Sequence, residues 1–204
     1  DMEGGKYYPG EGLIPSQAPC YLPNVLPVPG LGDFYDVIGW GSSIILGAWW
    51  HYWFYGDKKI LQDNYEAGKR YLAHLKTRVN GDGFISHGLG DWGNPAGEFA
   101  RENVETAFLY ADAVTLAKCA AVLREKEEGQ DGRDALTEPG RAEMIRIFEQ
   151  DEKDFLDFAE EVRRNYNEKL LVFDEERGRW CYRVWSHHDE IFCTQAAEAM
   201  PLFW

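Results

Sequence analysis

The chain has 204 residues, of which 45% are hydrophobic and 27% charged, so it fits one globular domain or part of a larger one and is not a disordered chain. Its formal net charge of -14 disfavours phosphate backbones, and we expect no nucleic-acid partner. Aromatic residues make up 15% of the chain. Together with many carboxylates they favour a neutral ligand such as a sugar, because rings stack on sugar C–H faces and carboxylates accept hydroxyl hydrogen bonds.

The N-terminal segment, residues 1–36, is predicted to be extended and to wrap around another part of the molecule. Six of the nine prolines lie in residues 1–33, interleaved with apolar residues that a free linker would lack. Residues 1–12 are polar and glycine-rich, and they do not have the pattern of a signal peptide. Residues 37–204 are predicted to form one helical domain, incomplete as it stands.

Four long helices are predicted in that domain from apolar periodicity and helix-ending residues, at 37–55, 58–79, 102–127 and 141–169. The stretch 170–184, "LLVFDEERGRWCYRV", alternates around a turn and predicts a short β-hairpin. Residues 191–204 are expected to start a fifth helix that breaks at Pro201 or soon after.

The fold class predicted from this order is all-α, part of an (α/α)6 six-hairpin toroid with a short β-hairpin near the C-terminus. Short turns make neighbouring helices antiparallel. The first and third helices are apolar and rich in small residues, whereas the second and fourth are charged on one side, which indicates an inner and an outer layer. Residues 37–56 carry no charge, but we interpret them as a buried inner helix and expect no membrane span. His51, within this helix, is interpreted as a core residue with a hydrogen-bond partner.

A glycine-rich loop, "FISHGLGDWGNP" at 84–95, carries the most specific chemistry. Loops that leave the inner helices of a toroid line one mouth, so this loop should meet the residues around the starts of the first and third helices. Aromatic platforms interleaved with carboxylates suit a sugar pocket. The residues expected at this mouth are Asp33, Asp36, Trp40, His87, Asp91, Trp92, Glu102 and Glu105.

Each of these residues also has a structural interpretation. Asp91 could cap a turn and Asp36 could cap a helix. Trp40 and Trp92 could be core residues, and Glu105 could make a structural hydrogen bond. The run "SHHDE" at 186–190 is interpreted as a solvated loop, because adjacent residues seldom point at one metal. No metal site and no cofactor motif is predicted.

The cysteines are predicted to be buried free thiols, since none of them has metal-ligand or Cys-x-x-Cys spacing. A Cys181–Cys193 disulfide is the alternative, if a hairpin brings the two together. The sequence leaves the redox compartment open. The four residues are Cys20, Cys119, Cys181 and Cys193.

An ordered set of segments resembles a known family. The segments "DVIGWGSSIILGAWWHYWFYGDKKILQDNYEAGKRYLAHL", "DGFISHGLGDWGNP", "ETAFLYADAVTLAKCA", "NYNEKLLV" and "TQAAEAMPLFW" are similar to the catalytic (α/α)6-barrel domain of bacterial α-L-rhamnosidases, which are inverting glycoside hydrolases. The resemblance implies that Trp40, Asp91 and Trp92 look onto the rhamnose pocket, and more loosely that Asp36 and Glu105 do. A rhamnose-containing glycan or glycoside is the implied partner.

The same resemblance implies that this chain lacks the full catalytic pair. The family's general acid is a Glu in an Arg-Asp-Glu segment upstream of the matched region, and its general base is a Glu in a later helix. The chain is therefore expected to hold pocket walls in about half a barrel, with catalytic residues unassigned. The remainder of the barrel, or a second copy, would cover its apolar face. A periplasmic or secreted location is implied by the resemblance alone.

Two further hypotheses stay open at this point. The chain could be a non-catalytic sugar-binding or scaffold domain. It could also belong to another six-hairpin glycosidase, such as a glucuronyl or arabinosyl hydrolase. Arg101 is the one arginine near the expected mouth, which favours a neutral over an acidic sugar.

Overall fold

A computed structural model describes residues 2–3, 6–7, 12–15, 36–92, 99–129, 139–186 and 191–203. In the N-terminal segment, β1 (Met2–Glu3) pairs with β2 (Lys6–Tyr7) as a short antiparallel ladder. Leu13 is buried, and Ile14 packs against the main hydrophobic core. Most of residues 1–36 lie outside the described residues, so the division of the chain at residue 36 stays a prediction.

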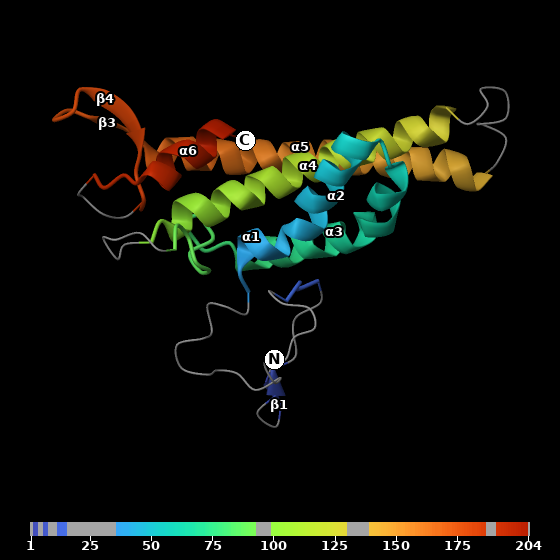
Figure 1. Cartoon of the computed structure of the whole chain (residues 1–204), viewed down its shortest axis with the longest axis horizontal. Coiled ribbons are helices and arrows are strands. Elements are labelled where there is room, and N and C mark those ends of the chain that lie inside the picture. Colours follow the sequence, from blue (N-terminus) through green and yellow to red (C-terminus); the bar gives the residue numbers. More distant parts are fainter. Residues whose placement is uncertain are drawn as a thin grey trace.

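The helical body consists of α1 (Ile38–Gly41), α2 (Ser43–Tyr55), α3 (Lys58–Arg78), α4 (Arg101–Gly129) and α5 (Pro139–Leu170), followed by a strand pair and α6 (Gln195–Phe203). In Figure 1, α4 and α5 lie side by side along most of their length, and α2 and α3 form a second helical pair beside α4. The all-α prediction is confirmed. The one helix predicted at 37–55 is divided at Ser42, whose hydroxyl donates to the Ile38 carbonyl at 2.9 Å and so competes with backbone bonding.

The core forms around α4, which is the inner helix of this body. Leu109, Leu116 and Leu123 of α4 are almost fully buried against α3 and α5. Gly68 lets α3 approach closely, since a Cβ there would lie 3.0 Å from Ile45 and 3.1 Å from Leu116. Small residues at such crossings bring the backbones of α2, α3 and α4 together.

By length and composition, α4 is long and apolar enough to cross a membrane, and it is the one such helix among the described residues. Most of its apolar surface is buried against the neighbouring helices, as in the core helix of a water-soluble domain. The absence of a membrane span stays a prediction.

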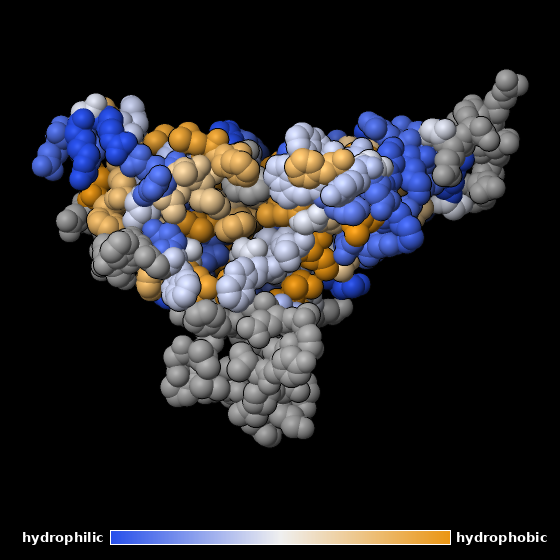
Figure 2. Space-filling model, in the orientation of Figure 1, coloured by the Kyte–Doolittle hydropathy of each residue, from blue (hydrophilic) through white to orange (hydrophobic). Residues whose placement is uncertain are grey.

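The second half of α2 differs from the predicted buried inner helix. Buried residues in α2 are Ile45, Leu46 and Ala48, all in its first half. Past them, four aromatic side chains are exposed, and apolar surface is visible across the body in Figure 2. In the described residues α2 packs mainly against α3 and α4, which leaves this end uncovered. The exposed residues, called the α2 aromatic face below, are Trp50, Trp53, Phe54 and Tyr55.

The interpretation of His51 as a core residue is wrong. His51 is exposed, and its Nε2 lies 3.6 Å from Asp57 Oδ2, just beyond the end of α2. His51 is exposed for the same reason as the α2 aromatic face, because the described elements leave this end of α2 uncovered.

The predicted hairpin is confirmed as β3 (Leu171–Asp174) paired antiparallel with β4 (Arg179–Tyr182). Arg179 then forms a bidentate pair with Glu198 of α6, at 2.7 and 2.8 Å, which ties the hairpin to the last helix. α6 continues through Pro201 to Phe203. Pro201 removes one backbone hydrogen bond but does not break the helix at that position.

Candidate functional site

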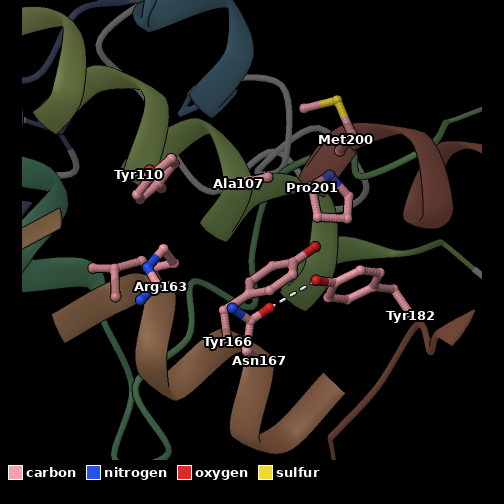
Figure 3. Close-up of a pocket in the computed structure, with 9 residues that line it drawn as sticks. Ala107, Tyr110, Arg163, Tyr166, Asn167, Tyr182, Met200 and Pro201 are labelled. Carbon is pink, nitrogen blue, oxygen red and sulfur yellow. Dashed lines mark hydrogen bonds between the residues drawn. The ribbon is translucent and has the colours of Figure 1, made fainter. Parts of the chain in front are cut away.

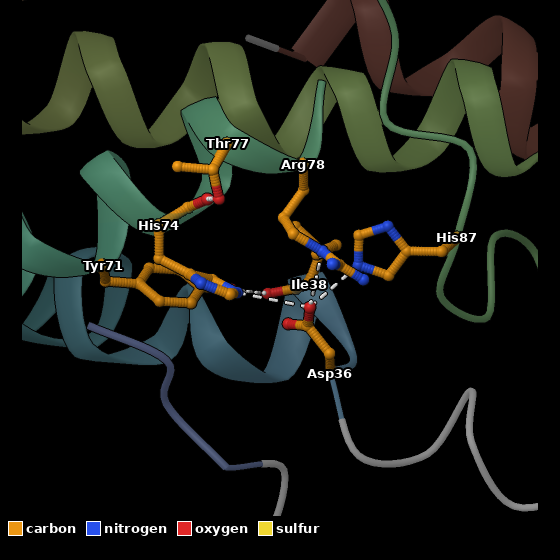
Figure 4. Close-up of polar contacts among 7 residues, drawn as sticks. All are labelled: Asp36, Ile38, Tyr71, His74, Thr77, Arg78 and His87. Atoms are coloured by element: carbon orange, nitrogen blue, oxygen red, sulfur yellow. Dashed lines mark hydrogen bonds and ion pairs between the residues drawn. The ribbon is translucent and has the colours of Figure 1, made fainter. Parts of the chain in front are cut away.

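The first part of the site is an ionic cluster around the buried Asp36, which precedes α1 (Figure 4). Asp36 Oδ2 lies 3.0 Å from His87 Nε2, 3.3 Å from His74 Nε2 and 3.4 Å from Arg78 Nε. His74 and Arg78 are one turn apart on α3, so both reach the same carboxylate. His87 arrives from the glycine-rich loop. The cluster therefore joins the start of α1, the end of α3 and the loop.

Asp36 stays ionised in this environment. Burial by itself raises the pKa of its carboxyl group, but hydrogen bonds and charge from His74 and His87 outweigh that effect and hold the pKa well below its usual range. A buried carboxylate needs such partners. Asp36 is thus both a structural anchor and a permanent negative charge next to the loop.

Glu105 of α4 holds the loop from its other side. It is 2% exposed, and its Oε1 accepts a hydrogen bond from the Gly90 N–H at 2.7 Å. Burial raises the pKa of Glu105 to about 7, although bonds from the backbone of Gly90 and Leu89 act in the opposite direction. Near neutral pH this carboxyl group therefore carries a proton for a large part of the time.

The loop glycines are required by this contact. Gly88 and Gly90 have φ angles of 101° and 58°, which side-chain-bearing residues rarely adopt. A Cβ at Gly88 would lie 2.5 Å from Glu105 Oε1. The two glycines therefore let the loop backbone approach the buried carboxyl group of Glu105 closely.

Asp91 and Trp92 follow directly on this held turn. Asp91 Oδ1 accepts from the Ala100 N–H at 2.6 Å, immediately before α4. This bond gives Asp91 a structural role, but it joins residues nine positions apart and is not the local turn cap of the sequence interpretation. Trp92 is 65% exposed and Trp40 is 45% exposed, so the interpretation of either as a core residue is wrong. Arg101 Nε donates to the Gly88 carbonyl at 2.9 Å and adds a further tie between α4 and the loop.

The structure thus joins most of the predicted residues through one loop. Asp36 contacts His87 directly, while Glu105 and Ala100 hold the turn that carries Asp91 and Trp92. Glu102 instead accepts from the backbone and the hydroxyl of Ser186, which gives it a structural role. Asp33 lies outside the described residues, as do residues 187–190 of the "SHHDE" run.

Sequence reasoning missed His74 and Arg78. The signal was present, because His74 lies between Leu72 and Leu75 on the buried stripe of α3, where a histidine needs a polar partner. Their common partner Asp36 is 38 residues from His74 in the chain. Only the folded structure identifies such a pair.

A further buried carboxyl group, Asp112 of α4, lies outside the predicted set. Its Oδ2 lies 2.6 Å from the Ser42 Oγ, within hydrogen-bonding distance, and burial raises its pKa to about 8 despite that contact. Tyr71 donates to the Ile38 carbonyl at 2.9 Å in the same region. At neutral pH Asp112 is therefore largely protonated and neutral.

A cavity of about 260 Å³ lies between α4, α5, β4 and α6 (Figure 3). Tyr182 donates to Asn167 Oδ1 at 2.7 Å in its wall, and the buried Tyr166 hydroxyl has no hydrogen-bond partner among the described residues. No predicted site residue lines it. In the described ranges, no three His, Cys, Asp or Glu side chains are grouped to hold a metal ion.

Comparison with known proteins decides the family. The model of the bacterial alpha-L-rhamnosidase 6 hairpin glycosidase domain matches residues 9–204. The chain belongs to this rhamnosidase family. The resemblance seen in the ordered sequence segments is thereby confirmed, and the two helical pairs are part of a six-hairpin toroid.

Two curated relatives carry the name α-L-rhamnosidase. The protein from Formosa agariphila is 35% identical over 99 residues, and the one from Streptomyces avermitilis is 31% identical over 101 residues. These matches cover 44% and 49% of this rhamnosidase-family chain, but 10% of each relative. The matched region is therefore about a tenth of the length of either relative.

Two solved structures share the fold. The α-L-rhamnosidase from Dictyoglumus thermophilum matches 71% of this chain and 14% of its own, with a TM-score of 0.53 and 27% identity. A Streptomyces avermitilis α-L-rhamnosidase complexed with L-rhamnose matches 72% and 12%, with a TM-score of 0.51 and 23% identity. The second likeness shows the fold alone.

Proposed function

We propose that this chain forms sugar-pocket walls of an α-L-rhamnosidase that removes terminal rhamnose from a glycan or glycoside with inversion. Family membership over residues 9–204 supports the reaction class. The hydrogen bond from Gly90 to buried Glu105 is the observation that carries the assignment of residues, because it fixes the turn from which Trp92 projects.

In this proposal the site residues have two kinds of role. Trp40, Trp92, His87 and Asp91 face the sugar, since all four keep some solvent exposure. The indole rings stack on the apolar face of rhamnose, and the polar side chains bond its hydroxyls.

Asp36 and Glu105 support the sugar-contacting residues from inside the protein. The two residues are 8% and 2% exposed, which leaves little surface for direct sugar contact in this conformation. They position the loop, and the fixed charge of Asp36 orients His87. A rigid supporting layer keeps the contacting groups in a productive geometry.

Inversion requires two carboxyl groups on opposite sides of the scissile bond. One protonates the leaving oxygen, and the other takes a proton from the attacking water. The burial of Asp36 and Glu105 argues against assigning either role to them. We therefore assign pocket walls to this chain and leave the catalytic pair unassigned.

Titration calorimetry of the 204-residue chain with L-rhamnose tests the binding half of the proposal, with L-fucose as a stereochemical control. We expect saturable heat with rhamnose and much weaker binding of fucose. Equal binding of both sugars, or of neither by a folded chain, would contradict the assignment.

Release of nitrophenol from nitrophenyl α-L-rhamnoside tests the catalytic half. We expect none from a folded, rhamnose-binding chain. Turnover that follows this chain through purification would mean that a competent acid and base lie within it, and the placement of the pair would be wrong.

A further inference from the structure

β4 and the segment that leads into α6 are held side by side. The Val184 N–H donates to the Phe192 carbonyl at 2.8 Å, and the rings of Trp185 and Phe192 stack with centroids 5.6 Å apart. The Arg179–Glu198 pair connects β4 to α6 itself. These contacts align the chain before α6 against the end of β4.

Two cysteines meet across this contact. Cys181 of β4 is 3% exposed and points into the protein, while Cys193 is partly exposed. The Cys193 thiol lies within hydrogen-bonding distance of the Cys181 thiol. Burial, and then the neighbouring Cys181, raises the pKa of Cys193 to about 12.

We propose that Cys181 and Cys193 are a disulfide-forming pair, which a small-molecule disulfide oxidises to join β4 covalently to the segment before α6. The partly exposed Cys193 thiolate attacks the oxidant, forms a mixed disulfide and releases one small thiol. The Cys181 thiolate then attacks the Cys193 sulfur and releases the second small thiol. Two protein thiols lose two protons and two electrons, and the small disulfide takes them up as two thiols.

The bond would reinforce the start of α4. Asn103 of α4 donates to the Arg183 carbonyl at 3.2 Å and to the Ala197 carbonyl at 3.1 Å, so it bridges the two elements that the disulfide joins. Glu102 binds Ser186 in the intervening loop. Because Ala100 and Arg101 hold the glycine-rich loop, a disulfide here stiffens the base of the proposed sugar site.

Peptide mapping of the 204-residue chain tests the pair directly. The chain is incubated with glutathione disulfide at pH 8.5, because the raised pKa of Cys193 keeps its thiolate scarce at neutral pH. Trypsin cuts after Arg179 and Arg183, which places the two cysteines on peptides 180–183 and 184–204. We expect these peptides to be recovered joined and to separate on reduction, while free thiols fall from the four cysteines of the sequence to two.

Two serine variants sharpen the result. Cys193→Ser should abolish the cross-link, whereas Cys20→Ser should leave it unchanged. Four persistent thiols, glutathione adducts as the final product, or a link from either residue to Cys20 or Cys119 would overturn the proposal.

Thermal unfolding gives an independent readout. Oxidation should raise the Tm of the wild-type chain by roughly 5–10 °C, as expected for closing a short loop in a chain of this size. Cys193→Ser should show no such rise. An unchanged Tm in a chain shown to be cross-linked would overturn the claim that the bond reinforces this region.

Discussion

The two apolar helices α2 and α4 have similar sequence character and opposite surroundings. α4 is buried on most sides. Its first half contains three buried polar residues, Glu102, Asn103 and Glu105. α2 has few buried residues, and its second half presents the α2 aromatic face to solvent. Composition predicts that both are apolar, but the neighbours of each helix decide what is buried.

The comparison also separates two kinds of unusual residue. The carboxyl groups of Glu105 and Asp112 are removed from water, so their pKa values rise to about 7 and about 8. The exposed rings of Trp50 and Trp53 contact each other edge to face, with centroids 5.7 Å apart, instead of entering the core. The first kind indicates a site that the fold supports at a cost in stability, and the second a surface available for contact.

The largest effect we expect is a fall in stability between pH 5 and pH 8, caused mainly by Asp112. In the folded chain its pKa is about 8, against an ordinary value of 3.8. The folded state therefore holds a proton that the unfolded state has lost, and stability falls as pH rises through this window. For Asp112→Asn, we expect this loss to shrink by roughly 3 kcal/mol, as measured by urea unfolding at both pH values.

Glu105 contributes to the same fall, with a folded pKa of about 7 against 4.5. Asp36 does not, because its lowered pKa makes stability fall only under more acidic conditions. An equal pH-dependent loss in wild type and Asp112→Asn would show that Asp112 is not held in its neutral form.

Gly88→Ala should give the next largest effect. Its φ of 101° is unfavourable for alanine, and the new Cβ would clash with Glu105 Oε1. We expect a loss of roughly 2 kcal/mol in the free energy of unfolding, together with weaker rhamnose binding.

Gly47→Ala in α2 is the matched control, because a Cβ there meets no atom within 4 Å. It should stabilise the chain by roughly 0.5–1 kcal/mol, since alanine favours a helix more than glycine does. Similar effects of both alanines in urea unfolding would remove the distinction between a held loop and an open helix surface.

The smallest expected effect concerns the α2 aromatic face. Trp53 and Phe54 are 63% and 68% exposed, so replacing both by Gln should change the free energy of unfolding by less than roughly 0.5 kcal/mol. The same change should reduce self-association at high protein concentration, as followed by sedimentation velocity. A large destabilisation would mean that these rings are buried in solution, for example by a second copy.

Much of this fold can be predicted from local patterns. The stripe that includes Leu61, Leu72 and Leu75 predicts α3, and alternation around Gly178 predicts the β3–β4 hairpin. The glycine-rich loop was identified from composition alone. The uncovered end of α2 could not be placed, because exposure depends on which elements pack against it.

The chemistry of the site is less accessible from sequence, because its pairs are distant in the chain. His74 and Asp36 are 38 positions apart, and Ser42 and Asp112 are 70 apart. No short motif encodes such contacts. The sequence indicated the importance of Glu105, but its role as the acceptor beneath Gly90 appears only in the folded chain.

Two tryptophans of almost equal exposure test the central claim, that the held loop presents Trp92 to rhamnose. Trp92 is 65% exposed on the loop, and Trp53 is 63% exposed on the α2 aromatic face. The measurement is the Kd for L-rhamnose of Trp92→Ala and Trp53→Ala, by calorimetry on folded chains. We expect about tenfold weaker binding for Trp92→Ala and no change for Trp53→Ala. Unchanged binding in Trp92→Ala, or an equal loss in both variants, would contradict the account.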